Sequence, residues 1–159
     1  MQITPPLSKP KRLIGIDFGL SRLGLALSDE RQIIASPLET LRAEKKTEQT
    51  VEKLLKVIDR LEAAHHCSIE AIIIGLPLMM SGKIGFQADE VRHFIAILSA
   101  STPIPIHTWD ERLSTVQADR ALREGQMSRK KRAQSVDIVS AAIILQSYLD
   151  CQYLSKPSQ

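Results

Sequence analysis

The sequence predicts an α/β protein with a mixed five-stranded sheet and helices on both of its faces. Near the N-terminus, three strand-like runs follow one another with connections too short for a crossover helix, which is typical of antiparallel neighbours. After them, helical periodicity alternates with strand-like runs, as in parallel α/β units. With 159 residues, 43% of them apolar and 25% charged, the chain is expected to form one folded domain.

The three antiparallel strands are predicted at Leu13–Phe18, Leu23–Leu27 and 33–41. Pro37 within the third run favours a sheet edge or a bulge, because proline cannot donate to the strand ladder. Side chains alternate between the two faces of a strand. The first strand therefore presents Leu13, Gly15 and Asp17 on one face and Ile14, Ile16 and Phe18 on the other.

The remaining elements are predicted from the spacing of apolar residues and from the positions of proline, glycine and helix-capping residues. Apolar residues at helical spacing predict helices at 51–61 and 91–98, separated by a buried strand at 71–75. A strand at 103–109, interrupted by Pro105, is expected near an edge. A capping box at Ser114 and Gln117 predicts a helix up to Gly125, and the apolar run 136–149 predicts a last helix buried against the sheet.

The domain is predicted to span residues 12–152, between a flexible segment at 1–11 and a tail at 153–159. No apolar run reaches the ~18 residues that a membrane span needs, and no signal peptide is recognisable. Cys67 and Cys151 fit neither a metal motif nor a disulfide framework. We therefore expect a cytoplasmic protein without a membrane partner, and the sequence indicates no oligomeric state.

The net positive charge of the chain is small, but its cations are concentrated in one segment. The formal net charge is +3 with a pI near 9.0, and four cations stand in succession at Arg129, Lys130, Lys131 and Arg132. With Arg22 and Arg112 they are candidates for binding the phosphates of a nucleic acid. The alternative is an ordinary solvated surface. We expect the segment 125–132 to be a loop that is mobile without substrate.

Acidic residues occupy unusual places in two elements. Asp17 interrupts an apolar strand, where it either belongs to a site, pairs with Arg12 or Arg22, or caps the turn at Gly19. Asp137 shares a helix face with Ala141, Ile144 and Tyr148, and the small residues Ser140 and Ala141 would let that helix approach the sheet closely. Its alternative role is that of an acid near a helix N-terminus.

A third acidic position lies where the last strand ends, at Asp110 and Glu111, and the residues alone do not decide which acid points into a site. Two carboxylates ~4 Å apart repel by roughly 4 kcal/mol at an effective dielectric near 20. Three converging acids therefore need a cation, and all-oxygen ligands favour Mg²⁺ or Mn²⁺. A pair of such ions suits phosphodiester hydrolysis. Trp109, just before these acids, either stacks on a base or packs at the rim of the core.

These residues resemble the YqgF/RuvX family of pre-16S ribosomal RNA nucleases. The resemblance rests on Gly15–Gly19 with Arg22, Gly24 and Ser28–Asp29, on Gly75–Leu78 with Gly82 and Gly85, on Trp109–Leu113, and on 136–150. It spans Arg12 to Asp150. Ser21, Met79, Ser81 and Ser140 depart from the family pattern, which puts substrate preference in question more than the metal centre.

The resemblance implies a ribonuclease H-like fold related to Holliday-junction resolvases, and processing of the 5′ end of pre-16S ribosomal RNA. It implies catalytic and metal-binding roles for Asp17, Glu111 and Asp137, and so favours Glu111 over Asp110. Two other functions stay open. One is a resolvase acting on branched DNA, and the other is a non-catalytic RNA-binding factor in ribosome assembly.

Overall fold

The computed structural model describes residues 7–76, 86–111 and 129–156, and within these ranges all side chains except those of 86–88 and 129–138. The predicted helix at 114–125 lies outside the described residues.

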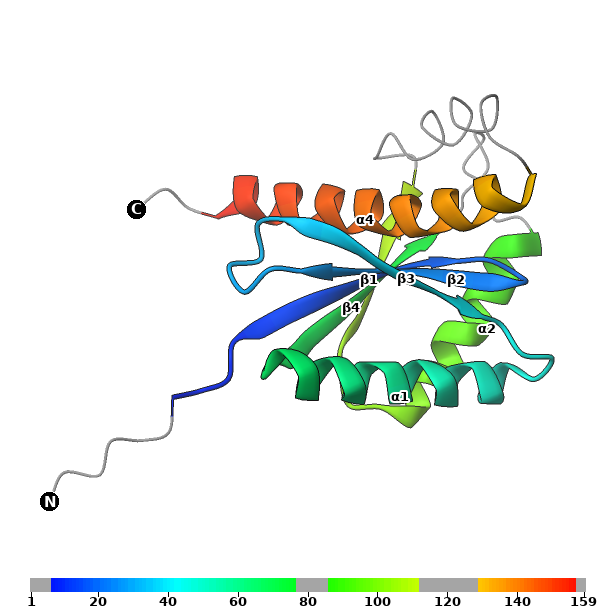
Figure 1. Ribbon diagram of the computed structural model, residues 1–159, viewed down its shortest axis with the longest axis horizontal. Helices are drawn as coiled ribbons and strands as arrows, with labels where there is room; N and C mark the ends of the chain where they lie inside the picture. The colour runs from blue at the N-terminus through cyan, green and yellow to red at the C-terminus, as the bar shows by residue number, and fades with distance from the viewer. Residues whose placement is uncertain (1–6, 77–85, 112–128, 157–159) are drawn as a thin grey trace, which may run out of the picture.

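Five strands form one sheet in the order β3-β2-β1-β4-β5 (Figure 1). They are β1 (Lys11–Phe18), β2 (Arg22–Ser28), β3 (Ala35–Arg42), β4 (Ser68–Leu76) and β5 (Ile106–Asp110). β1, β2 and β3 pair antiparallel, whereas β4 pairs parallel with both β1 and β5. The mixed five-stranded sheet predicted from the sequence is confirmed. β5 begins three residues later than predicted, after Pro105.

Three described helices cover the two faces of this sheet. α1 (Thr47–His65) and α2 (Phe86–Ser101) lie on one face, and α4 (Arg129–Ser155) crosses the other (Figure 1). α4 begins seven residues earlier than predicted. Arg129–Arg132 therefore open a helix, which corrects the expectation of a loop there, because arginine and lysine are good helix formers. Residues 125–128 lie outside the described residues.

The larger core cluster lies between the sheet and helices α1 and α2. Ile14 and Ile16 of β1 are fully buried on this face, as the alternation of the first strand predicted. The helical stripe of α1 is buried against them through Leu54 and Ile58. Phe94 of α2 closes the cluster, with its ring centroid 5.0 Å from that of Phe18. Because Ile14 and Ile16 face α1 and α2, the alternate residues Gly15 and Asp17 of β1 face α4.

The opposite face is built so that α4 can approach β1 closely. A Cβ atom on Gly15 would lie 2.7 Å from the Leu145 Cβ and 2.9 Å from the Ala141 carbonyl oxygen. These distances are too short for any real side chain, so the helix rests directly on the glycine. The smaller cluster on this face contains Leu13, Ala26, Ala71, Ile73, Ala141, Ile144, Leu145 and Leu149. The close approach predicted from Ser140 and Ala141 is confirmed.

None of the described helices has both the length and the apolar character that crossing a lipid bilayer requires.

Candidate active site

Asp17 is buried on the face of the sheet that α4 covers. It lies next to the last residue of β1, and only 4% of its surface is exposed. Its register partners on both neighbouring strands are glycines, Gly24 on β2 and Gly75 on β4. Register partners in a sheet present their side chains on the same face, so no side chain from either strand stands directly beside this carboxylate.

Glu111 fills one of these two vacant positions. It follows the last residue of β5 and is 2% exposed, and its Oε1 atom lies 3.0 Å from the place that a Cβ on Gly75 would take. The neighbouring Asp110 is only half-buried and pairs with Leu76 at the strand end. Of the two acids that the sequence left open, Glu111 is thus the one turned inward, over the residue that pairs with Asp17.

The helix α4 runs antiparallel to β1, so its N-terminal part lies toward the end of β1 that carries Asp17. Its Leu149 borders the same pocket as Leu13, and its Ala141 lies over Gly15. Two residues along β1, or about 6.6 Å, lead from Gly15 to Asp17. One helical turn, about 6 Å, leads from Ala141 to position 137. The backbone register therefore carries position 137 toward Asp17, while the side chain of Asp137 lies outside the described residues.

The chemistry of this arrangement is set by two buried carboxylates on one face of the sheet. Both Asp17 and Glu111 engage other groups of the protein. Their all-oxygen donor set fits a hard divalent cation. Among the described side chains, which do not include that of Asp137, no group of three His, Cys, Asp or Glu is placed to hold a metal ion.

The predicted phosphate-binding cations are only partly described. Arg22 begins β2 and is half-buried, and its carbonyl accepts a hydrogen bond of 3.0 Å from the Gly19 backbone N–H in the β1–β2 turn. This places Arg22 at the same end of the sheet as Asp17. Arg112 lies outside the described residues, as do the side chains of Arg129, Lys130, Lys131 and Arg132.

Trp109 has a packing role next to the site. Its indole Nε1–H donates to the Ser147 hydroxyl at 3.1 Å, and its ring meets Tyr148 edge to face with centroids 5.7 Å apart. Trp109 is also the register partner of Gly75. The half-buried indole therefore ties β5 to α4 just before Glu111, in keeping with its interpretation as a residue at the rim of the core.

Sequence reasoning missed the role of the two glycines beside Asp17. Gly24 and Gly75 each interrupt an apolar strand, and glycine within a strand often marks a close approach of other groups. That signal was present in the sequence. The sequence does not give the pairing register of β1 with β2 and β4, and only this register aligns the two glycines with Asp17.

A protein-family model described as "RuvX: Holliday junction resolvase" matches residues 11–151. A protein of Protochlamydia amoebophila named "Putative pre-16S rRNA nuclease" is 66% identical over 142 residues, covering 89% of this chain and 95% of that protein. A protein of the same name from Halothermothrix orenii is 42% identical over 141 residues, covering 89% and 96%.

Among solved structures, RuvC of T. thermophilus in complex with a Holliday junction substrate superposes with a TM-score of 0.52 at 15% sequence identity, covering 90% of this chain and 96% of that one. At that identity the likeness supports the fold alone, which is the ribonuclease H-like fold expected from the sequence. The family match covers nearly the whole chain, and the chain belongs to the RuvX family.

Proposed function

We propose that this protein is a metal-dependent endonuclease that processes the 5′ end of pre-16S ribosomal RNA in the cytoplasm. Relatives that are 66% and 42% identical carry the name of pre-16S rRNA nucleases and match along almost their whole length. The single observation that carries the proposal is the Glu111 carboxylate lying over Gly75, the register partner of the buried Asp17.

Asp17, Glu111 and Asp137 would hold Mg²⁺ or Mn²⁺, with two ions as the expected number. When bound, such ions lower the pKa of an attacking water and neutralise charge on the phosphate and the leaving oxygen. The residues present fit this use, because the two described acids are buried, supply only oxygen ligands and stand on the ends of strands. Side chains on such rigid supports keep their geometry when substrate binds.

The other residues of the site position it. Gly75 accommodates the Glu111 carboxylate over the position that pairs with Asp17. Arg22, Arg112 and the four cations at 129–132 would hold the phosphate backbone of the RNA, which fixes register without reading sequence. Trp109 holds the end of β5 against Ser147 and so fixes the point from which Glu111 projects.

The test is cleavage of precursor rRNA by purified protein, with Mg²⁺ and with a chelator. We expect 5′-end product only with metal. Losing a metal ligand removes several kcal/mol of transition-state stabilisation, so Asp17→Asn and Glu111→Gln should each lower the rate more than about a hundredfold. Asp110→Asn is the matched control, because it neutralises the adjacent acid that is not turned inward.

Full cleavage by a clean preparation of Asp17→Asn would refute the assignment. Equal losses in Asp110→Asn and Glu111→Gln would refute the choice between those two acids. RNA binding that persists in chelator, without product under any metal, would instead favour the non-catalytic assembly factor, whose affinity should fall steeply with salt.

A Holliday junction resolvase is the second candidate, because the matching family model carries that description. Branched DNA and structured RNA are both polyanions, so the same cations could bind either one and the same acidic site could cleave it. Cleavage of a four-way junction and of precursor rRNA, measured side by side with the same preparation, separates the two. A preference for the junction of more than about tenfold in rate, or roughly 1.4 kcal/mol, would assign the resolvase activity.

A further inference from the structure

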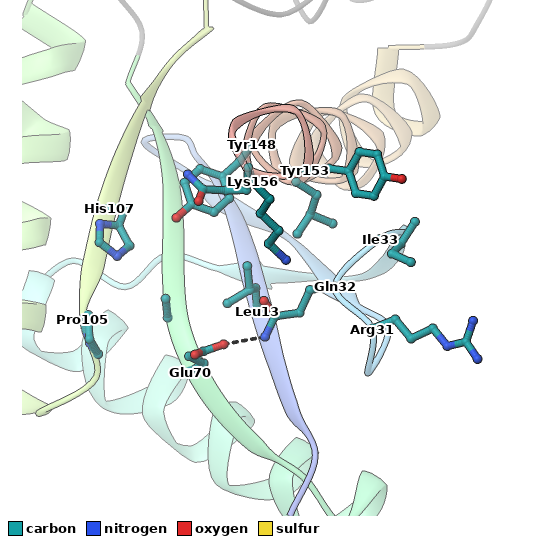
Figure 2. Close-up of a pocket in the computed structure, with 13 residues that line it drawn as sticks. Leu13, Arg31, Gln32, Ile33, Glu70, Pro105, His107, Tyr148, Tyr153 and Lys156 are labelled. Atoms are coloured by element: carbon teal, nitrogen blue, oxygen red, sulfur yellow. Dashed lines mark hydrogen bonds between the residues drawn. The ribbon is translucent and has the colours of Figure 1, made fainter. Parts of the chain in front are cut away.

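A pocket lies at the other end of the α4 face, where β1 begins. Its volume is about 470 Å³, within the range of small-molecule sites. Figure 2 shows its walls: His107 on β5, Glu70 on β4, Leu13 on β1, Tyr148 on α4 and Lys156 just after the end of α4, with the β2–β3 turn opposite. Of the described acids of the candidate active site, neither Asp17 nor Glu111 lines it.

Two backbone irregularities shape this pocket. Arg12 pairs with Ile69 and Leu13 with Ala71, so Glu70 is an extra residue in β4, in a bulge without a register partner on β1. Bulges re-aim a side chain and are frequent beside functional sites. In the β2–β3 turn, Gln32 has a φ of 56°, in the left-handed region that residues other than glycine rarely adopt. Its amide donates to the Glu70 carboxylate (Figure 2) and also to the Lys11 carbonyl.

The turn that carries Gln32 is held by hydrogen bonds within the turn and by hydrogen bonds to α4. The Asp29 carboxylate accepts hydrogen bonds from the backbone N–H groups of Ile33 and Ile34, at 2.7 and 2.9 Å. Gln146 of α4 accepts from the Ala35 N–H and donates to the Ile33 carbonyl, each at 2.8 Å. The walls of the pocket are therefore held together before any ligand arrives, which lowers the entropic cost of binding one.

The lining combines flat rings with a cation. The rings of His107 and Tyr148 lie within 18° of parallel, with centroids 6.1 Å apart. Tyr153, one helical turn beyond Leu149, leaves 69% of its surface in water at the mouth. Lys156 directs its ammonium group into the pocket (Figure 2). Burial is the main cause that raises the pKa of Tyr148, and the nearby negative charge of Glu70 adds to it. The phenol therefore stays neutral and can donate a hydrogen bond.

We propose that this pocket binds one nucleotide, with the base against the aromatic side chains and the phosphate at Lys156. Aromatic rings beside a cation are the combination by which proteins hold single nucleotides without reading their sequence. The exposed ring of Tyr153 provides a stacking surface at the mouth. The polar floor at Glu70 and Gln32 supplies hydrogen-bonding groups for a base or a ribose.

The nucleotide can come from two sources. Leu13 and Asp17 are four residues apart on β1, so the pocket lies about 13 Å from the acidic site on the same face of the sheet. A stacked strand with a rise of 3.4 Å spans that distance with roughly four nucleotides. An unpaired end of the RNA substrate is therefore one source, and this version rests on the proposed function. A free nucleotide acting as a separate ligand is the other.

The experiment measures binding in chelator, so that it does not depend on cleavage. Full-length protein is titrated with AMP and, separately, with a short oligoadenylate, and affected residues are located by amide chemical shifts. Tyr153→Ala removes the exposed ring and Lys156→Ala the cation. Their matched controls are Leu154→Ala, the next residue along and 83% exposed, and Lys56→Ala, on the far side of the sheet.

AMP should shift amides around Tyr148 and Gln32. Loss of one base–aromatic stack corresponds to at least about a fivefold weakening, so we expect that effect from Tyr153→Ala and a comparable one from Lys156→Ala. The controls should stay within about twofold, as surface substitutions do. If these variants also weaken the oligoadenylate and AMP competes with it, the source is the RNA strand. If only AMP binding weakens, the ligand is a free nucleotide.

No AMP binding, or equal binding in all four variants, would overturn the proposal. It would also be overturned if the protein were a dimer that Tyr153→Ala and Leu154→Ala dissociate while AMP affinity stays unchanged, because the apolar mouth would then be an interface between two copies. Failure of the proposed function has a different result, namely AMP binding at the pocket without cleavage of any RNA or DNA.

Discussion

The Glu111 carboxylate occupies the space that a side chain on Gly75 would need. Its Oε1 atom lies 3.0 Å from that Cβ position, and the Ile144 Cδ1 atom lies only 2.4 Å from it. Gly75 on β4 thus accommodates both the acid that follows β5 and the helix above it. Gly75 is also the register partner of Asp17, and β4 lies between β1 and β5, so the two acids flank this one glycine.

Gly75→Ala should therefore damage the fold and the site together. Overpacking of this kind costs roughly 1–3 kcal/mol of unfolding free energy, and the new methyl group displaces the Glu111 carboxylate. Denaturant unfolding and cleavage assays on the same preparation measure the two effects. The companion variant Gly75→Ala/Ile144→Val removes the methyl group of the nearest contact, so it should recover stability but not cleavage. Recovery of both would show that Glu111 had not moved.

Ser147→Ala should lower the unfolding free energy by about 1 kcal/mol, since it removes the partner of the half-buried Trp109 indole. Trp109 is the single tryptophan of the chain, so its fluorescence should report a wetter environment in the folded variant. Ser101→Ala on α2 is the control, because that exposed hydroxyl donates to the Ile97 carbonyl of its own helix. An unchanged emission spectrum and unchanged stability would contradict the packing role of Trp109.

The stability contributed by Asp29 should depend on pH. Although partial desolvation acts to raise its pKa, the backbone N–H groups of Ile34 and Ile33 lower it below the ordinary value. A group with a lowered folded-state pKa stabilises the protein above its unfolded pKa, near 3.9, and loses that contribution as pH falls through the folded-state value.

Asp29→Ala should thus destabilise the protein at pH 7 by roughly 0.5–2 kcal/mol, as loss of a capping side chain does, and by less at pH 3. Urea unfolding at the two pH values measures this. Asp59→Ala, at an exposed position on α1, serves as the control for a general effect of charge. A difference between Asp29→Ala and the native protein that grows toward acid would have the wrong sign.

Most of the fold could be predicted from periodicity. Alternation in β1 assigned Ile14 and Ile16 to one face and Gly15 and Asp17 to the other, because successive side chains of a strand point to opposite faces. The start of α4 was placed too late because Arg129–Arg132 interrupt the apolar pattern while still favouring helix. The four charged residues concealed the start of α4, although their helix propensity alone would have extended the predicted helix to include them.

The candidate site was predictable only in part. Asp17 could be singled out because a carboxylate inside an apolar strand needs a reason. Glu111 could not be separated from Asp110 by the residues alone, since the direction of a side chain at a strand end depends on how the backbone leaves the sheet. The nucleotide pocket left no periodic signal, because a bulge at Glu70 and a left-handed Gln32 create it.

The most direct test of the central claim is a Mn²⁺ titration of the native protein, Asp17→Asn, Glu111→Gln and Asp110→Asn, followed by thermal unfolding. If Asp17 and Glu111 hold one ion together, saturating Mn²⁺ stabilises the native protein by about 2.7 kcal/mol at a hundred times its dissociation constant. The same stabilisation should appear in Asp110→Asn and vanish in the other two variants. Equal stabilisation of all four proteins would contradict the claim.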